Sequence, residues 1–343
     1  MSRITTLLRS IAACTCIALL GAGLAACGPK GSAQTASSSE TGASTASDSP
    51  VTVVAAENTW GSLAEEIGGD QVTVTSILDD TSEDPTAFAP TSDEKTEIAD
   101  AQVVIVNGAG YDDWASSQTN NDQTVINAAS LVGATKGDNP YLWFSKDVRS
   151  SMATAIADEL SKLAPDASDD IAQNLSTWQK EEEDLENTIS SMGKDYSGTH
   201  YMATVPVGYY MFSELGLIDD TPSSYSTTVL KGQSPSDDDI QAFTEAISDD
   251  MKFMVSDSQH VTDAMNQLTG YAGRMDRPVV TLTEQMPESA STLDGWITSV
   301  LSNFGKQVSA ADSSDGSSTD SPSDSASAST SATADATQSG SGN

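Results

Sequence analysis

Short apolar runs alternate with helical repeats of apolar residues from about residue 51 to residue 306. This alternation is typical of successive βα units, whose strands form mainly parallel sheets. The pattern predicts strands over 51–56, 72–78, 103–106, 125–128, 200–205, 252–255 and 278–282. It also predicts helices between them, including one over 60–67 and one over 237–247.

Two further helices are predicted between the first four strands and the last three. The first ends before Pro165 and repeats apolar residues on one face, namely Val148, Met152, Ile156, Leu160 and Leu163. The second, over 168–193, carries an apolar stripe, with Ser168 and Asp169 as N-cap residues and Gly193 at its end. Its acidic run 181–184 interrupts the stripe and is expected to face solvent.

These elements indicate an α/β fold of two lobes, each a mainly parallel sheet flanked by helices, joined by one long helix. We expect the N-terminal lobe over 51–167, the joining helix over 168–193 and the C-terminal lobe over 194–306. A helix packed on a single domain is the alternative, which composition does not reject.

The composition changes at both ends of the chain. Residues 1–26 have the features of an export signal, because Arg3 and Arg9 accompany an apolar run over 11–24 that is too short to span a bilayer. The run ends in LAACG (24–28), which resembles a bacterial lipobox with Cys27 as the lipid attachment point. An ordinary secretory peptide with an incidental cysteine is the alternative. Residues 27–50 are expected to form a flexible tether, and 307–343 a disordered acidic Ser-rich tail.

Cysteine usage and charge narrow the classes of partner. The cysteines are Cys14, Cys16 and Cys27, so processing and lipidation would leave no free thiol, which excludes disulfides and thiolate zinc sites. The formal net charge is −35, which repels nucleic acid and attracts cations. Solubility alone is the alternative reason for such acidity. We expect a monomer that binds no nucleic acid.

Motifs of catalysis are missing from the sequence. It has no Gly-x-Ser-x-Gly elbow, no His-Glu-x-x-His and no Walker loop, and its two histidines are too few for a network of general bases. The sequence therefore predicts that the protein is not an enzyme.

Several segments, in this order, resemble the zinc- and manganese-type solute-binding lipoproteins of ABC transporters. They are AENTWG (56–61), DPTAFAPT (84–91), NGAGYDDW (107–114), NPYLWF (139–144), ATVPVGY (203–209), ELGL (214–217) and PVVTLTE (278–284). The resemblance implies two α/β lobes joined by a rigid helix, with a metal ion or other small solute captured between them and delivered to an ABC permease. It also implies a lipid-anchored protein at the cell membrane, facing outside the cytoplasm, that carries Zn or Mn as transported ligand and needs no cofactor. The alternative is a divergent paralogue that binds no metal and acts in adhesion or as an accessory interaction protein.

The resemblance implies four metal-ligand positions, which fall on Thr86, Tyr141, Val205 and Asp257. Thr and Tyr hydroxyls are weak zinc donors and Val has none, so only Asp257 suits a metal. We therefore expect zinc to bind far more weakly than in a three-histidine relative. Glu57 and Asp112 are the candidate substitute ligands, and an all-oxygen set would prefer harder ions such as Mn²⁺ or Ca²⁺. Solvated side chains are the alternative for both.

Aromatic residues are expected to line the cleft between the lobes, as they do in the family that the chain resembles. The candidates are Phe88, Tyr111, Trp114, Trp143 and Tyr209, together with Tyr141 and Tyr210. A place in the core is the alternative for each. His200 is expected to be structural, whereas His260 lies either at the surface or in the cleft, three residues after Asp257.

Overall fold

The computed structural model describes residues 49–315. The expected signal peptide and Cys27, nearly all of the tether, and the tail beyond 315 lie outside the described residues. Within the described part, two sheets of four parallel strands are present, with strand orders β2-β1-β3-β4 and β6-β5-β7-β8. The strands are β1 (Val51–Glu57), β2 (Val72–Leu78), β3 (Val103–Val106), β4 (Thr124–Asn127), β5 (His200–Ala203), β6 (Ile218–Asp219), β7 (Met251–Asp257) and β8 (Val279–Leu282).

The first sheet is covered by helices on both faces. Successive strand residues point to opposite faces, and both sets are apolar in β1 and β3. Val54 and Val104 pack beneath α2 (Ser92–Asp100) and α3 (Asp113–Ser116). Val53 and Ile105 join the core formed with α1 (Asn58–Gly68), α4 (Ala128–Val132) and α5 (Lys146–Leu163). The apolar runs on both faces therefore explain the layered N-terminal lobe.

The second sheet repeats this arrangement. Met202 and Met254 pack against α8 (Ser223–Leu230), α9 (Asp237–Ala246) and α10 (Asp263–Arg274). On the opposite face lie α7 (Tyr209–Glu214) and α11 (Leu293–Asp315), where Phe304 of α11 contacts the ring of Phe253 at a centroid distance of 5.5 Å. Three short 3₁₀ turns complete the described elements, over Gly69–Gln71, Leu142–Phe144 and Pro165–Ala167.

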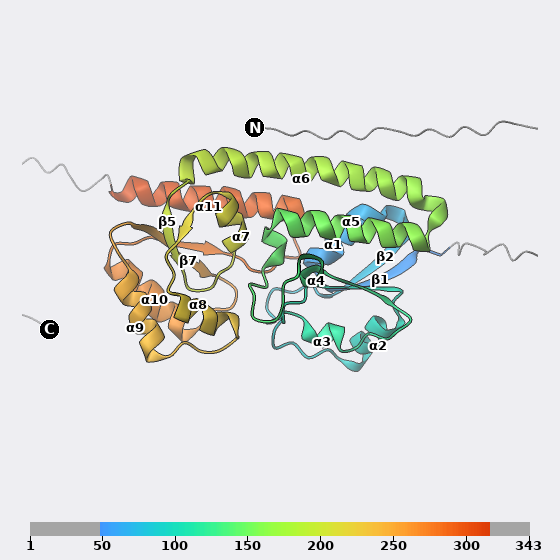
Figure 1. The fold of residues 1–343 in the computed structure, drawn as a ribbon, viewed down its shortest axis with the longest axis horizontal. Helices are drawn as coiled ribbons and strands as arrows, with labels where there is room; N and C mark the ends of the chain where they lie inside the picture. Colours follow the sequence, from blue (N-terminus) through green and yellow to red (C-terminus); the bar gives the residue numbers. More distant parts are fainter. Residues whose placement is uncertain (1–48, 316–343) are drawn as a thin grey trace, which may run out of the picture. The chain divides into compact units, whose positions relative to one another are not determined.

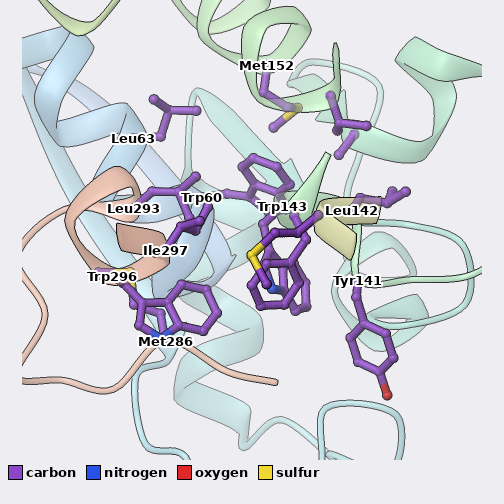
Figure 2. Packing of buried hydrophobic residues seen from close by; sticks show 14 of the residues in the cluster. Trp60, Leu63, Tyr141, Leu142, Trp143, Met152, Met286, Leu293, Trp296 and Ile297 are labelled. Carbon is purple, nitrogen blue, oxygen red and sulfur yellow. The ribbon is translucent and has the colours of Figure 1, made fainter. Parts of the chain in front are cut away.

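One long helix, α6 (Ser168–Tyr196), joins the lobes as predicted (Figure 1). It packs on α1 and α5 of the N-terminal lobe and on α7 and α11 of the C-terminal lobe. Its buried side chains include Trp178 and Leu185, which belong to a single apolar core that also holds Trp60 and Phe304. Figure 2 shows part of this core, in which Trp60 and Trp143 lie near Leu293 and Ile297 of α11. The lobes therefore share one core along their helical side.

Several details differ from the sequence prediction. Helix α6 continues past Gly193 to Tyr196, and its N-cap is Ala167 rather than Ser168 or Asp169. The acidic run of α6 is not wholly solvated, because Glu182 is buried and its carboxylate accepts from Arg149 Nε at 2.8 Å and Nη2 at 2.6 Å. Strand β6 was not predicted, since its two residues are too short to produce a pattern. Helix α11 continues to Asp315, so the tail boundary expected at 307 falls within a helix.

Between residues 49 and 315 we find no helix of the length and apolarity that crossing a bilayer requires.

Candidate functional site

The carboxyl ends of both sheets supply the residues at which the lobes meet. In parallel sheets such ends, near the point where strand order reverses, are the usual place for a ligand. Three amide side chains bond across the lobes to backbone oxygens at this place: Asn58 Nδ2 to Met286 O, Asn139 Nδ2 to Pro206 O, and Gln285 Nε2 to Glu83 O, each at 2.9 Å. The meeting edge of the lobes is therefore held by neutral hydrogen bonds.

Glu284, directly after β8, is the centre of the buried polar cluster at this edge. Tyr111 Oη donates to Glu284 Oε1 and Tyr141 Oη donates to Oε2, both at 3.1 Å. Figure 2 shows the Tyr141 ring reaching out of the packed core, with its hydroxyl directed away from Trp143. The two tyrosines come from the N-terminal lobe, so the C-terminal lobe presents a carboxyl group to two hydroxyls of its neighbour. Each carboxylate oxygen can accept more than one hydrogen bond, so Glu284 still has lone pairs with which to bind a ligand.

Asp257 and His260 lie beside Glu284. Asp257 ends β7, and one of its oxygens, Oδ2, accepts from the backbone N–H of His260 at 2.6 Å. That bond turns the chain so that His260 Nε2 lies 3.9 Å from Glu284 Oε1. Asp257 Oδ1 and His260 Nε2 are buried and have no hydrogen-bond partner among the described residues. The cluster therefore contains a carboxylate oxygen and an imidazole nitrogen that are free to bind something else.

Burial disfavours the charged form of Glu284 in this cluster. Loss of solvent, and then the nearby Asp257, raise the pKa of Glu284 to about 8. Burial, and next the Glu284 charge, also raise the pKa values of Tyr111 and Tyr141, so both phenols stay protonated at neutral pH and act as donors. In the described part of the chain, neither Asp257 nor Glu284 forms an ion pair with a lysine or an arginine.

The four ligand positions implied by the resemblance are not equivalent in the structure. Tyr141 donates a hydrogen bond to Glu284. Burial, then the charge of Glu284 and then that of Asp257, raise the pKa of Tyr141, so positions 141 and 257 lie close together. Thr86 is exposed, and its hydroxyl donates to Asp84 Oδ1 at 2.7 Å within a tight turn. Val205 is half-buried and offers no donor atom. Nowhere in residues 49–315 do three His, Cys, Asp or Glu side chains stand close enough to hold a metal ion without rearrangement.

The proposed substitute ligands, Glu57 and Asp112, adjoin Tyr111 rather than Asp257. Glu57 ends β1, and its charge raises the pKa of Tyr111, as that of Glu284 does. Asp112 is fully buried and accepts from the backbone N–H groups of Asn107 at 2.6 Å and Gly108 at 2.8 Å. Tyr111 therefore lies between two carboxyl pairs, one from each lobe.

The expected aromatic lining is dispersed. Tyr111 reaches the site, whereas Trp143 is buried in the shared core. Phe88 and Trp114 contact each other at 4.8 Å in the N-terminal lobe, where Trp114 Nε1 donates to Pro85 O. Tyr209 is exposed, with its ring 5.6 Å from that of Tyr210.

Glu284 is the residue that the sequence analysis did not place in the site, whereas it left His260 open between the surface and the cleft. The resemblance calls for a carboxylate on the loop after a late strand, and Asp257 after β7 was chosen for it. Glu284 meets the same description after β8 and is the one that binds Tyr141. Nothing in the local pattern distinguishes the two, because both follow apolar strands. His200 is a structural residue as expected, since its Nδ1 lies 2.8 Å from Asp220 Oδ2.

Comparison with known proteins agrees with this architecture. The sequence matches the family model for the zinc-uptake complex component A, periplasmic, over residues 53–307. The manganese-binding lipoprotein MntA of Halalkalibacterium halodurans is 27% identical over 146 residues, which make up 40% of this chain. The matched part spans 48% of that relative, or about half of its length.

Solved structures share the fold. The periplasmic zinc-binding protein TroA of Treponema pallidum superposes with a TM-score of 0.64 at 15% identity, over 77% of this chain and 99% of that one. A mutant of the laminin-binding adhesin Lmb from Streptococcus agalactiae gives a TM-score of 0.62 at 18% identity, over 76% and 98% of the two chains. At such identities the likeness concerns the fold alone, and laminin binding is a property of that adhesin. The comparisons do not favour a non-metal-binding adhesion protein.

The match over 53–307 takes in both lobes, the joining helix and every residue of the interlobe cluster. The chain therefore belongs to the family of the periplasmic zinc-uptake complex component A, whose members are solute-binding proteins of metal-ion ABC importers and not enzymes.

Proposed function

We propose that this protein captures a divalent cation between its lobes and delivers it to an ABC permease. The observation that supports this most is the set of buried groups at the meeting edge: Asp257, Glu284 and an imidazole nitrogen of His260 that has no hydrogen-bond partner among residues 49–315. Two neighbouring carboxyl groups removed from water, with no lysine or arginine paired to them in the described part of the chain, carry a large desolvation cost. A bound cation offsets that cost directly.

The donor set favours an oxygen-seeking ion over zinc. Zinc sites with high affinity use several imidazole or thiolate donors around a tetrahedron. Here one imidazole accompanies two carboxyl groups, and Thr86 and Val205 contribute no comparable donor. Carboxylate and other oxygen ligands suit Mn²⁺, so we place Mn²⁺ before zinc as the cargo. Glu57 and Asp112, the substitute ligands expected from the sequence, lie beside Tyr111 rather than beside Asp257 and do not belong to this donor set.

Export and anchoring complete the proposal. Lipid on Cys27 would hold the two lobes outside the cytoplasmic membrane, beside a permease, with the residues between Cys27 and β1 as a tether. The description of the MntA relative as a lipoprotein supports this location. The protein would act as a monomer that presents its cargo to the permease.

Calorimetry with Mn²⁺ and with Zn²⁺ on the purified protein tests the cargo site. We expect one Mn²⁺ per chain, with affinity at least roughly tenfold lower in Glu284→Gln and in Asp257→Asn, equivalent to ~1.4 kcal/mol. Asp113→Asn is the matched control, because Asp113 is exposed and pairs only with Lys136 at the surface. Nanomolar zinc binding that Thr86→Ala abolishes, or no binding of either ion, would contradict the proposal.

A further inference from the structure

A second carboxyl pair, formed by Glu57 and Asp112, lies on the N-terminal side of Tyr111. Their exposed fractions are 4% and 0%. The two groups are close enough for a hydrogen bond, and both are acceptors when ionised. Asp112 already accepts two backbone N–H groups, whereas neither oxygen of Glu57 accepts a bond from any residue in 49–315. No donor therefore stands between these two carboxyl groups.

A small cavity adjoins Glu57 of this pair at the meeting edge of the lobes. Its volume is about 10 Å³, which is roughly the room that one water-sized group needs. Glu57 lines it from β1, and Gln285 lines it from the loop after β8. Gln285 is 7% exposed, and its Oε1 has no partner in the described part of the chain. Asp79 and Asp80 line the same cavity from the loop after β2. Oxygen atoms from both lobes thus surround a space for a single ion.

A proton is the competing occupant of the pair. Burial, followed by the Asp112 charge, raises the pKa of Glu57 well above its ordinary value. One shared proton would satisfy one oxygen of Glu57. The other oxygen of Glu57 and Gln285 Oε1 would both remain without a hydrogen-bond partner in the described part of the chain. A metal cation is bound by several oxygens at once, so it satisfies the carboxyl pair and the amide together.

The donor atoms identify the class of cation. Carboxylate and amide oxygens are hard ligands, and no histidine or cysteine is among the described residues that line this cavity, whose one sulfur is the weakly binding thioether of Met286. Ca²⁺ accepts irregular sets of carboxylate and carbonyl oxygens, whereas Mg²⁺ keeps several waters in a strict octahedron. A cavity for one water-sized group has no space for such a hydrated ion.

We propose that Glu57, with Asp112 adjoining it, and the side-chain oxygen of Gln285 form a second cation site, separate from the cargo site, for a hard divalent ion of the Ca²⁺ type. Because Glu57 belongs to the N-terminal lobe and Gln285 to the C-terminal lobe, the ion stabilises the contact between the lobes. This inference does not depend on the cargo bound at Glu284.

The test measures thermal unfolding and terbium luminescence of the purified protein after chelation. Tb³⁺ is a luminescent substitute for Ca²⁺, and Tyr111 beside the site would sensitise its emission. We expect Ca²⁺ to raise the Tm and to displace Tb³⁺, and we expect Glu57→Gln and Gln285→Met each to weaken Ca²⁺ binding at least roughly tenfold, or ~1.4 kcal/mol. Glu65→Gln, on the exposed face of α1, is the matched control and should bind Ca²⁺ as the unaltered protein does.

Glu284→Gln separates this site from the cargo site. It should lower Mn²⁺ binding and leave the Ca²⁺ response in place. If Glu284→Gln abolishes the Ca²⁺ response while Glu57→Gln keeps it, the ion lies at the cargo site and the inference fails. The inference also fails if Ca²⁺ changes neither the Tm nor the luminescence and Glu57→Gln alone raises the Tm, because Glu57 then holds a proton.

Discussion

At the residue scale, the hydroxyl of Tyr141 decides how Glu284 is held. Tyr141→Phe removes one of the two hydrogen bonds to this carboxyl group and leaves the ring in place. We expect the free energy of unfolding to fall by about 1 kcal/mol, because a buried acceptor loses its partner. The pKa of Glu284 should rise further, since the hydroxyl stabilises the charged form. Urea denaturation and a carboxyl ¹³C NMR titration measure the two effects. Tyr209→Phe, at an exposed ring, should change neither.

Restoring strong donors at the implied ligand positions tests whether those positions are correctly assigned. The triple variant Thr86→His, Tyr141→His, Val205→Glu supplies two imidazoles and a carboxylate at the implied positions, of which position 141 adjoins Glu284. We expect its zinc affinity to exceed that of the unaltered protein by roughly a hundredfold, or ~2.7 kcal/mol. Zinc calorimetry on both proteins measures the difference. An unchanged zinc affinity in a folded triple variant would show that the assignment is wrong.

Only part of this site could be predicted from single residues. Tyr111 and Tyr141 were expected near the cleft, because they lie in segments that the resemblance aligns. Glu284 was not chosen, because Asp257 also follows an apolar strand, and only the packing of the lobes shows which carboxyl group faces Tyr141. His260 joins them through a turn made by its own N–H bond to Asp257, and a lone loop histidine gives no signal of such a turn.

At the scale of the elements, a buried ion pair joins α5 and α6 in the shared core. Arg149 is fully buried, bonds both oxygens of Glu182 and donates from Nη1 to Trp143 O at 2.9 Å. Glu182→Ala leaves the guanidinium without its partner, so we expect a loss of about 3–5 kcal/mol in unfolding free energy. Urea denaturation measures this loss. Glu183→Ala is the matched control, because Glu183 is exposed, and its effect should stay within about 0.5 kcal/mol.

The elements were predicted well wherever an apolar period was long enough to be recognised. Strands β1 and β3 and helices α5 and α6 carry strong patterns, because both strand faces or a whole helix face are largely buried, and the edge strand β2 shows the alternation of a half-buried strand. Glu182 shows the limit of this approach. An acidic run indicates a face exposed to solvent. Glu182 is nevertheless buried, because it pairs with Arg149, which lies 33 residues away in the sequence.

At the scale of the whole molecule, a third group of acids lies where α1, α6 and α11 meet. Burial, followed by the charge of Asp294, raises the pKa of Glu66 to about 8. Burial, followed by the charge of Glu182, raises the pKa of Asp294 to about 7, although Arg149 opposes this shift. Both Asp294 oxygens are buried without a partner in the described part of the chain. Because α1 belongs to one lobe and α11 to the other, the protonation of Glu66 and Asp294 influences how the two lobes pack together.

The protein should therefore lose stability as the pH rises from about 5 to 8. In this range the folded chain holds protons on Glu66 and Asp294 that the unfolded chain, with ordinary carboxyl pKa values near 4, has released. The folded state then binds more protons than the unfolded state, so the free energy of unfolding falls with rising pH. Asp294→Asn removes one of these charges. We expect this variant to stabilise the protein by on the order of 2 kcal/mol at pH 8.5, and by much less at pH 5.5, where Asp294 is already neutral.

Urea denaturation at the two pH values measures this difference, with Asp184→Asn on the exposed face of α6 as the control. Two results would contradict this prediction: a stability that rises from pH 5.5 to 8.5, or an equal gain from Asp294→Asn at both pH values. Either would show that Asp294 is charged throughout and that α1, α6 and α11 pack around an ionised carboxylate.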